Sequence, residues 1–142
     1  MVKGQRIVCL LDTGASHNFI STRMVARRGL PIVDIPEFEV KVAGDEVLGC
    51  TGKVVGLQIQ FDDYLLETDF YIVDFDGLDA ILGRQWLRTL RRYTFDHETM
   101  QLEFFQGDRL VVLRAIPVSG PKLISAHRME AILRHDDIEW AT

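Results

Sequence analysis

The sequence has few cysteines, no long apolar run and no excess of positive charge. Cys9 and Cys50 are its only cysteines among 142 residues, which is too few for a disulfide scaffold and indicates a reducing compartment. No run of about 18 apolar residues occurs, so we expect no membrane span. The formal net charge of -5 gives no electrostatic support for binding nucleic acid.

The histidines also lack the spacing of a metal site. His97, His127 and His135 do not have the spacing of metal ligands, and neither cysteine pairs with them. Structural and catalytic metal sites draw their ligands from closer pairs of such residues. We therefore expect no metal and no cofactor.

What the sequence does contain is an apolar run that ends in an acid. Ile7–Leu11 is followed at once by Asp12, Thr13 and Gly14. A carboxylate at the end of a buried strand is costly unless something uses it. Thr13 and Gly14 allow a tight turn that leaves the acid at the rim of a core. A turn without further function is the alternative interpretation, since all three are common turn residues.

Short strands separated by turn residues account for most of the chain. We expect strands over 5–11, 19–20, 37–43, 46–60, 64–73, 79–83, 95, 100–105 and 109–114. Short helices are expected over 22–28, between a Ser21 cap and Gly29, and over 84–90. A third helical pattern runs from Ala126 to about Arg134. This predicts an all-β fold, mainly β with two or three short helices, arranged as a small closed barrel or a rolled β-structure, with a helical C-terminal tail.

Residues 37–60 have the pattern of a long hairpin. Residues 37–43 alternate polar and apolar side chains, as in a half-exposed strand. Gly44 and Asp45 form a turn pair, and Gly49, Gly52 and Gly56 interrupt the returning strand. The hairpin is therefore expected to carry polar residues on one face.

These motifs together resemble the retropepsins, the aspartic protease domains of retroelements, and in particular those of gypsy-type retrotransposons of plants. The resemblance covers about residues 5–116. It depends on five segments and four single residues: Leu10–Ser21, Val42–Asp45, Asp69–Val73, Asp79–Gly83 and Gln85–Leu87, with Leu48, Cys50, Asp96 and Met100. It implies an aspartic protease fold.

The resemblance also implies roles for individual residues. Asp12 would be the catalytic aspartate. The active-site loop and its substrate contacts would come from Thr13, Gly14, Ala15 and Ser16. The flap that closes over a peptide would comprise Ala43, Gly44, Asp45 and Glu46, and the loop would be supported by Ile81, Leu82, Gly83 and Arg84. His17 is either a cleft residue that modulates the pH response or, as we favour, a solvent-facing turn residue.

The motif Asp-Thr-Gly occurs once in the chain, and this count has a chemical consequence. Peptide hydrolysis by carboxylates needs one ionised and one protonated acid, which share a proton. A two-fold dimer would bring Asp12 to a second Asp12 on its axis. The sequence thus predicts an aspartic endopeptidase that is active as a homodimer and hydrolyses an extended peptide with a water between the two carboxylates.

The resemblance also sets expectations about the wider context. Residues 1–116 would be the protease domain, and 117–142 a linker and helix leading toward a reverse transcriptase region. The substrate would be a Gag-Pol-like polyprotein, in the cytoplasm or within virus-like particles, with no nucleic acid or membrane bound by this domain. The alternative is a catalytically inactive module of the same fold, element-derived or like that of a ubiquitin-shuttle protein, which binds peptides or dimerises.

Overall fold

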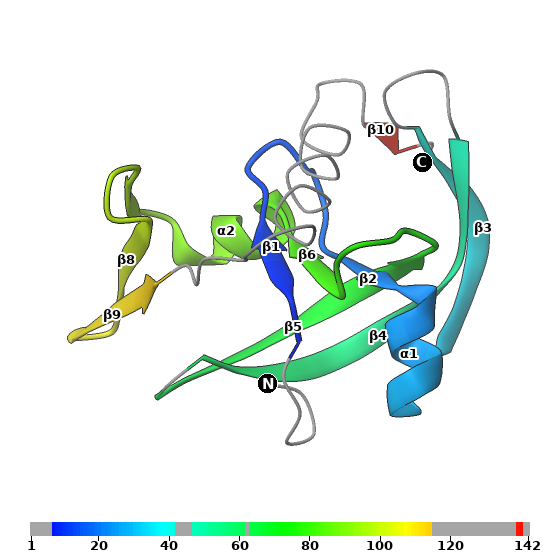
Figure 1. Ribbon diagram of the computed structural model, residues 1–142, viewed down its shortest axis with the longest axis horizontal. Coiled ribbons are helices and arrows are strands. Elements are labelled where there is room, and N and C mark those ends of the chain that lie inside the picture. Colours follow the sequence, from blue (N-terminus) through cyan, green and yellow to red (C-terminus); the bar gives the residue numbers. More distant parts are fainter. Residues whose placement is uncertain (1–6, 42–46, 62, 115–138, 141–142) are drawn as a thin grey trace.

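The fold is mainly β, with two short helices, as expected (Figure 1). The computed structural model describes residues 7–41, 47–61, 63–114 and 139–140. Among these residues, ten strands form a seven-stranded and a three-stranded sheet. No helix in the described ranges is long and apolar enough to cross a membrane. The expected closure into a barrel stays a prediction.

The larger sheet has the order β1-β6-β2-β5-β4-β3-β10. Its three short strands lie at one end of this order: β1 (Cys9–Leu11) at the edge, then β6 (Ala80–Leu82) and β2 (Phe19–Ser21). β1 runs parallel to β6, whereas β2 runs antiparallel to β6 and parallel to β5 (Tyr64–Val73). β1 and β6, about 70 residues apart in the sequence, therefore pair at this end of the sheet.

The long strands β3 (Val33–Lys41) and β4 (Val47–Phe61) form the expected hairpin. β3 begins earlier than the predicted residue 37, because Val33 and Asp34 already pair with Lys53 and Gly52. The pairing shifts between Asp34 and Phe38, where Pro36 has no amide hydrogen to donate to the partner strand. The predicted turn and flap, Ala43 to Glu46, lie outside the described residues.

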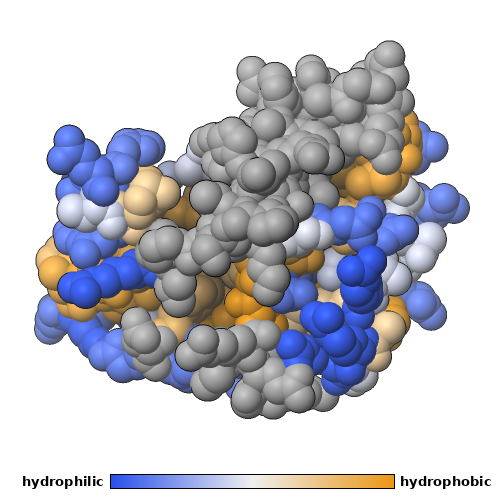
Figure 2. Space-filling model, viewed as in Figure 1, coloured by the Kyte–Doolittle hydropathy of each residue, from blue (hydrophilic) through white to orange (hydrophobic). Residues whose placement is uncertain are grey.

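Both helices have the predicted limits. α1 (Thr22–Arg28) begins after Ser21, whose hydroxyl accepts a hydrogen bond from the Met24 amide at 3.1 Å. It ends at Gly29, which adopts the left-handed conformation that favours glycine. Exposed Arg23 and Arg27 make the surface over α1 hydrophilic (Figure 2). α2 (Arg84–Leu90) buries Trp86 and Leu87.

The smaller sheet, β7-β8-β9, follows α2 and packs against it. It consists of β7 (Thr94–Asp96), β8 (Gln101–Gln106) and β9 (Arg109–Arg114). Phe104 of β8 makes edge-to-face ring contacts with Tyr64 and Trp86. Met100 lies in the turn before β8 with a φ of 57°, so the predicted strand over 100–105 begins one residue late.

Two further differences concern the ends of the chain. Only Cys9–Leu11 of the predicted strand 5–11 is a strand among the described residues, because β6 offers three pairing residues. Residues 139–140, expected in a tail beyond the domain, form β10 and pair antiparallel with Val40 and Lys41 of β3. The helical pattern over 126–134 lies outside the described residues.

The core consists of two clusters of buried hydrophobic residues. One contains Ile20, Met24, Phe70, Trp86 and Phe104, and the other contains Ala15, Phe19, Val40, Cys50 and Ile81. Ala15 and Ile81, both predicted site residues, are therefore core residues that fix the loop containing Asp12.

Candidate active site

Asp12 lies at the end of β1, at the start of a tight turn. Its backbone amide donates to the Leu82 carbonyl oxygen at 2.9 Å, which continues the pairing of β1 with β6. Its side-chain Oδ1 accepts a hydrogen bond from the Gly14 amide at 2.9 Å, and its carbonyl oxygen accepts one from the Ala15 amide at 3.2 Å. The turn therefore orients the carboxyl group through its own backbone.

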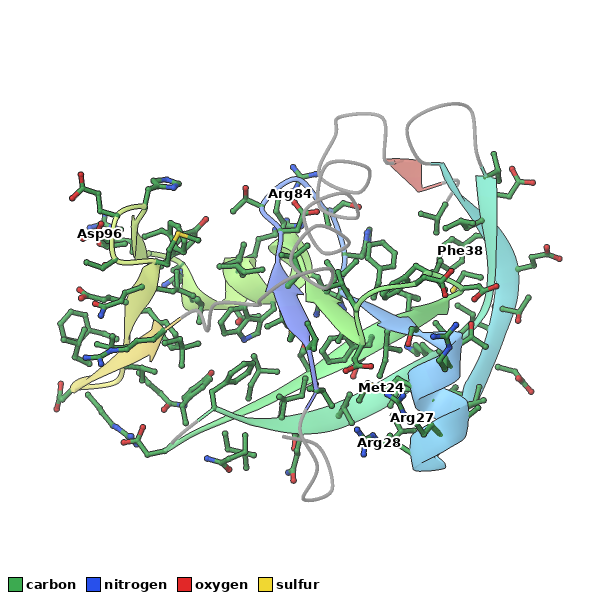
Figure 3. All side chains as sticks on the ribbon, in the orientation of Figure 1. Met24, Arg27, Arg28, Phe38, Arg84 and Asp96 are labelled. Carbon is green, nitrogen blue, oxygen red and sulfur yellow. The ribbon has the colours of Figure 1, made fainter. Side chains whose placement is uncertain are left out.

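Residues 12–18, between β1 and β2, form the Asp12 loop. The turn at Gly83, between β6 and α2, lies directly against this loop and is called the Gly83 turn. The Arg84 amide donates to the Ala15 carbonyl oxygen at 2.8 Å. A Cβ atom at Gly83 would meet the Ala15 carbonyl oxygen at 2.5 Å and would overlap the His17 carbonyl oxygen. Figure 3 shows Arg84 beside the β1–β2 loop. The structure thus brings Gly83 and Arg84 to the Asp12 loop, as a supporting role requires.

Asn18 is the residue at this site that sequence reasoning missed. Its side chain is fully buried and contacts both the Gly83 turn and β5. Its Oδ1 accepts from the Gly83 amide at 2.9 Å, and its Nδ2 donates to the Asp69 carbonyl oxygen at 3.1 Å. The only signal in the sequence was the place of this amide residue, shortly after the Asp-Thr-Gly motif and directly before the apolar residues of β2.

Ser16 and His17 lie between the Asp12 turn and Asn18, and both are half-buried. The Ser16 hydroxyl lies 2.8 Å from His17 Nδ1, and the His17 ring makes an edge-to-face contact with Tyr71. Tyr71 in turn makes such a contact with Phe38 of β3. Burial, with smaller effects of Arg84 and Arg88, lowers the pKa of His17 below its ordinary value of 6.5. The favoured interpretation of His17 as a solvent-facing residue therefore understates its packing.

The other predicted site residues are divided between the turn and the core. Thr13 is exposed and Gly14 is half-buried, whereas Ala15, Leu82 and Gly83 are buried. The predicted flap residues, Ala43 to Glu46, lie outside the described residues. Within the part of the chain that the structure describes, no group of three or more His, Cys, Asp or Glu residues could hold a metal ion.

Asp12 itself has no solvent-exposed surface in the single chain. A carboxyl group that activates water must be reached by that water and by the substrate. Catalysis by this residue would therefore require that dimerisation or substrate binding make the Asp12 carboxyl accessible.

Comparisons with known proteins agree with this fold. The profile of the retroviral aspartyl protease family matches residues 1–104. Among solved structures, the retroviral protease-like domain of Ddi1 from Leishmania major superposes with a TM-score of 0.60 at 14% sequence identity, over 82% of this chain and 90% of that one. A search of curated proteins found no significant match.

The fold and the Asp12 loop define a retropepsin-like aspartic protease domain, which confirms the expected fold class. The chain belongs to the retroviral aspartyl protease family, since the family profile covers most of its length. The similarity to the Ddi1 domain supports the fold alone, because the two sequences share few residues.

Proposed function

We propose that the protein is an aspartic endopeptidase that acts as a homodimer with one Asp12 from each chain. The observation that carries this proposal is the single Asp-Thr-Gly turn, whose acid is oriented by the Gly14 amide and held against the Gly83 turn. One chain supplies one such acid, and the chemistry needs two. A two-fold axis through the site provides the second.

The two acids divide the work of hydrolysis. The ionised Asp12 accepts a proton from a water molecule, whose oxygen attacks the carbonyl carbon of the scissile peptide bond. The protonated Asp12 of the second chain donates its proton to the carbonyl oxygen. The C–N bond then breaks as the first Asp12 gives its proton to the leaving nitrogen, while the second Asp12 takes back a proton from a hydroxyl group of the adduct. Because one of two close carboxyl groups must stay protonated, the reaction is expected to be fastest at mildly acidic pH.

The substrate we propose is an extended peptide segment of a retroelement polyprotein, with the Gag-Pol-like precursor of a gypsy-type element as its source. An extended peptide can pair through its backbone with strand edges while alternate side chains enter pockets. The proposed setting is the cytoplasm, including virus-like particles assembled there.

The test is cleavage of a peptide library by the wild-type chain and by Asp12→Asn. We expect the variant to keep its fold and its oligomeric state while cleavage falls by at least about 1,000-fold, since the base is lost. Asp108→Asn removes an exposed acid in the β8–β9 turn and serves as the matched control. Undiminished cleavage by Asp12→Asn would contradict the proposal.

A second candidate is a peptide-binding module without catalysis, and the complete burial of Asp12 favours it. Under this alternative, peptides from the library would bind without being cleaved, and the affinity of Asp12→Asn would equal that of wild type. Sedimentation at several concentrations adds a second criterion. A chain that stays monomeric at the highest concentration would favour the binding module over the dimeric enzyme.

A further inference from the structure

Asn18 is the only asparagine in the sequence, and it lies six residues after Asp12, where the Asp12 loop enters β2. Its side chain is completely buried. A buried amide is costly unless its donors and acceptor are satisfied. The partners of Asn18 therefore show which parts of the chain it holds together.

The side-chain amide joins two segments that are distant in sequence. Oδ1 accepts a hydrogen bond from the Gly83 amide at 2.9 Å. Nδ2 donates to Thr68 Oγ1 at 3.2 Å and to the Asp69 carbonyl oxygen at 3.1 Å. One amide thus connects the turn between β6 and α2 with the middle of β5.

The backbone of Asn18 reaches the same two segments. Its amide donates to Gln85 Oε1 at 3.0 Å, in the first turn of α2. Its carbonyl oxygen accepts from the Tyr71 amide at 2.9 Å, on β5. The end of the Asp12 loop is therefore fixed from both sides by side-chain and backbone hydrogen bonds.

We propose that Asn18 is a positioning residue for Asp12. The side-chain amide of Asn18 holds the Asp12 loop against the Gly83 turn, because its oxygen accepts from Gly83 while its nitrogen donates to Thr68 and Asp69 on β5. This inference rests on the proposed aspartic protease function. Asn18 acts through the Gly83 turn, which in turn contacts Ala15 and His17 of the Asp12 loop.

Asn18→Asp tests whether the side chain at position 18 must both accept and donate hydrogen bonds, because aspartate has nearly the same shape as asparagine. A protonated carboxyl group has one donor and can still accept from Gly83, whereas an ionised one only accepts. The ionised form would turn an acceptor toward the Asp69 carbonyl oxygen, which cannot donate. Other charged or titratable groups on the elements that contact position 18 are Asp12, His17, Tyr64, Glu67, Asp69, Tyr71, Arg84 and Arg88.

The experiment measures kcat and KM for peptide cleavage against pH for wild type and Asn18→Asp. At neutral pH we expect the kcat of the variant to fall by about 100-fold, the cost of a slightly misplaced catalytic group, with KM nearly unchanged. Acidification should recover part of the lost kcat as the introduced carboxyl group becomes protonated. Gln106→Glu, which adds an acid at the exposed end of β8, should follow the wild-type profile.

Thr68→Val keeps the inference testable if Asn18→Asp unfolds at neutral pH. It removes one acceptor of the Asn18 amide while Asn18 stays in place, and we expect kcat to fall several-fold at unchanged KM and unchanged pH profile. An Asn18→Asp profile equal to that of wild type, or a Thr68→Val variant with the wild-type kcat, would overturn the inference alone. A wild-type chain that cleaves no peptide would instead overturn the proposed function.

Discussion

The backbone amide of Arg84 donates a 2.8 Å hydrogen bond to the carbonyl oxygen of Ala15, three residues after Asp12. Through this contact the β6–α2 turn supports the Asp12 loop, although the two segments are about 70 residues apart in the sequence. The two backbones can approach this closely because the residue before Arg84 is a glycine.

Gly83→Ala should disturb this approach directly. The new Cβ would lie 2.5 Å from the Ala15 carbonyl oxygen and would overlap that of His17, and backbone atoms at this depth cannot move aside cheaply. We expect the free energy of unfolding to fall by about 3 kcal/mol, at the upper end of what overpacking costs. Denaturant unfolding measures this change.

Gly49→Ala is the matched control for Gly83→Ala. A Cβ at Gly49 would meet only Glu37 Oε1 at 3.6 Å, which is ordinary contact, at an exposed position of β4. Its effect on the free energy of unfolding should stay within about 0.5 kcal/mol. Equal effects of the two substitutions would show that Gly83 is not required by the close approach.

The pH dependence of stability should depend in part on His17. Burial and, secondarily, Arg84 and Arg88 lower its pKa from 6.5 in the folded chain, so the unfolded chain binds the proton more readily. Stability therefore falls as pH drops below about 6.5, where only the unfolded form is protonated at first. Thermal unfolding of His17→Gln should show a smaller loss between about pH 7 and pH 5 than wild type does.

His97→Gln controls for the loss of a histidine, because His97 lies exposed in the turn after β7. The relevant quantity is the slope of the unfolding temperature against pH, since the lost contact between His17 and Tyr71 changes stability at every pH. A His17→Gln slope equal to that of wild type would contradict the assigned burial of the ring.

Both cysteines should be unreactive in the folded protein. Cys9 is half-buried and Cys50 is buried. Desolvation raises the pKa of the Cys9 thiol to about 12, and it also raises the pKa of Cys50, whose Sγ donates to the Gly52 carbonyl oxygen. The thiolate is the reactive form. A thiol-disulfide reagent at about pH 8 should therefore label neither thiol until denaturant is added. Rapid labelling of the native chain would contradict this picture.

Local sequence signals predicted the helices and several strands well. Ser21 and Gly29 bound α1 as a cap and a left-handed terminator, and both signals act within one turn of the helix. β5 and β9 have the predicted limits as well, because turn residues adjoin them in the sequence.

Features that depend on distant partners could not be predicted from the sequence. β1 is short because β6 pairs with only three of its residues, and β3 begins early because β4 is long enough to pair with Val33. The position of Asn18 at the junction of the Asp12 loop, the Gly83 turn and β5 likewise follows only from the sheet order. The candidate acid, by contrast, was identifiable from the sequence because its motif is local.

Mixing wild-type and Asp12→Asn chains tests most directly whether Asp12 is half of a catalytic pair. At equal amounts, fixed total concentration and free exchange, about one quarter of the dimers contain two intact acids. We therefore predict about one quarter of the activity of the all-wild-type sample, and a dependence on the square of the wild-type fraction. Activity of about one half, proportional to that fraction, would show that each chain acts alone and would contradict the account.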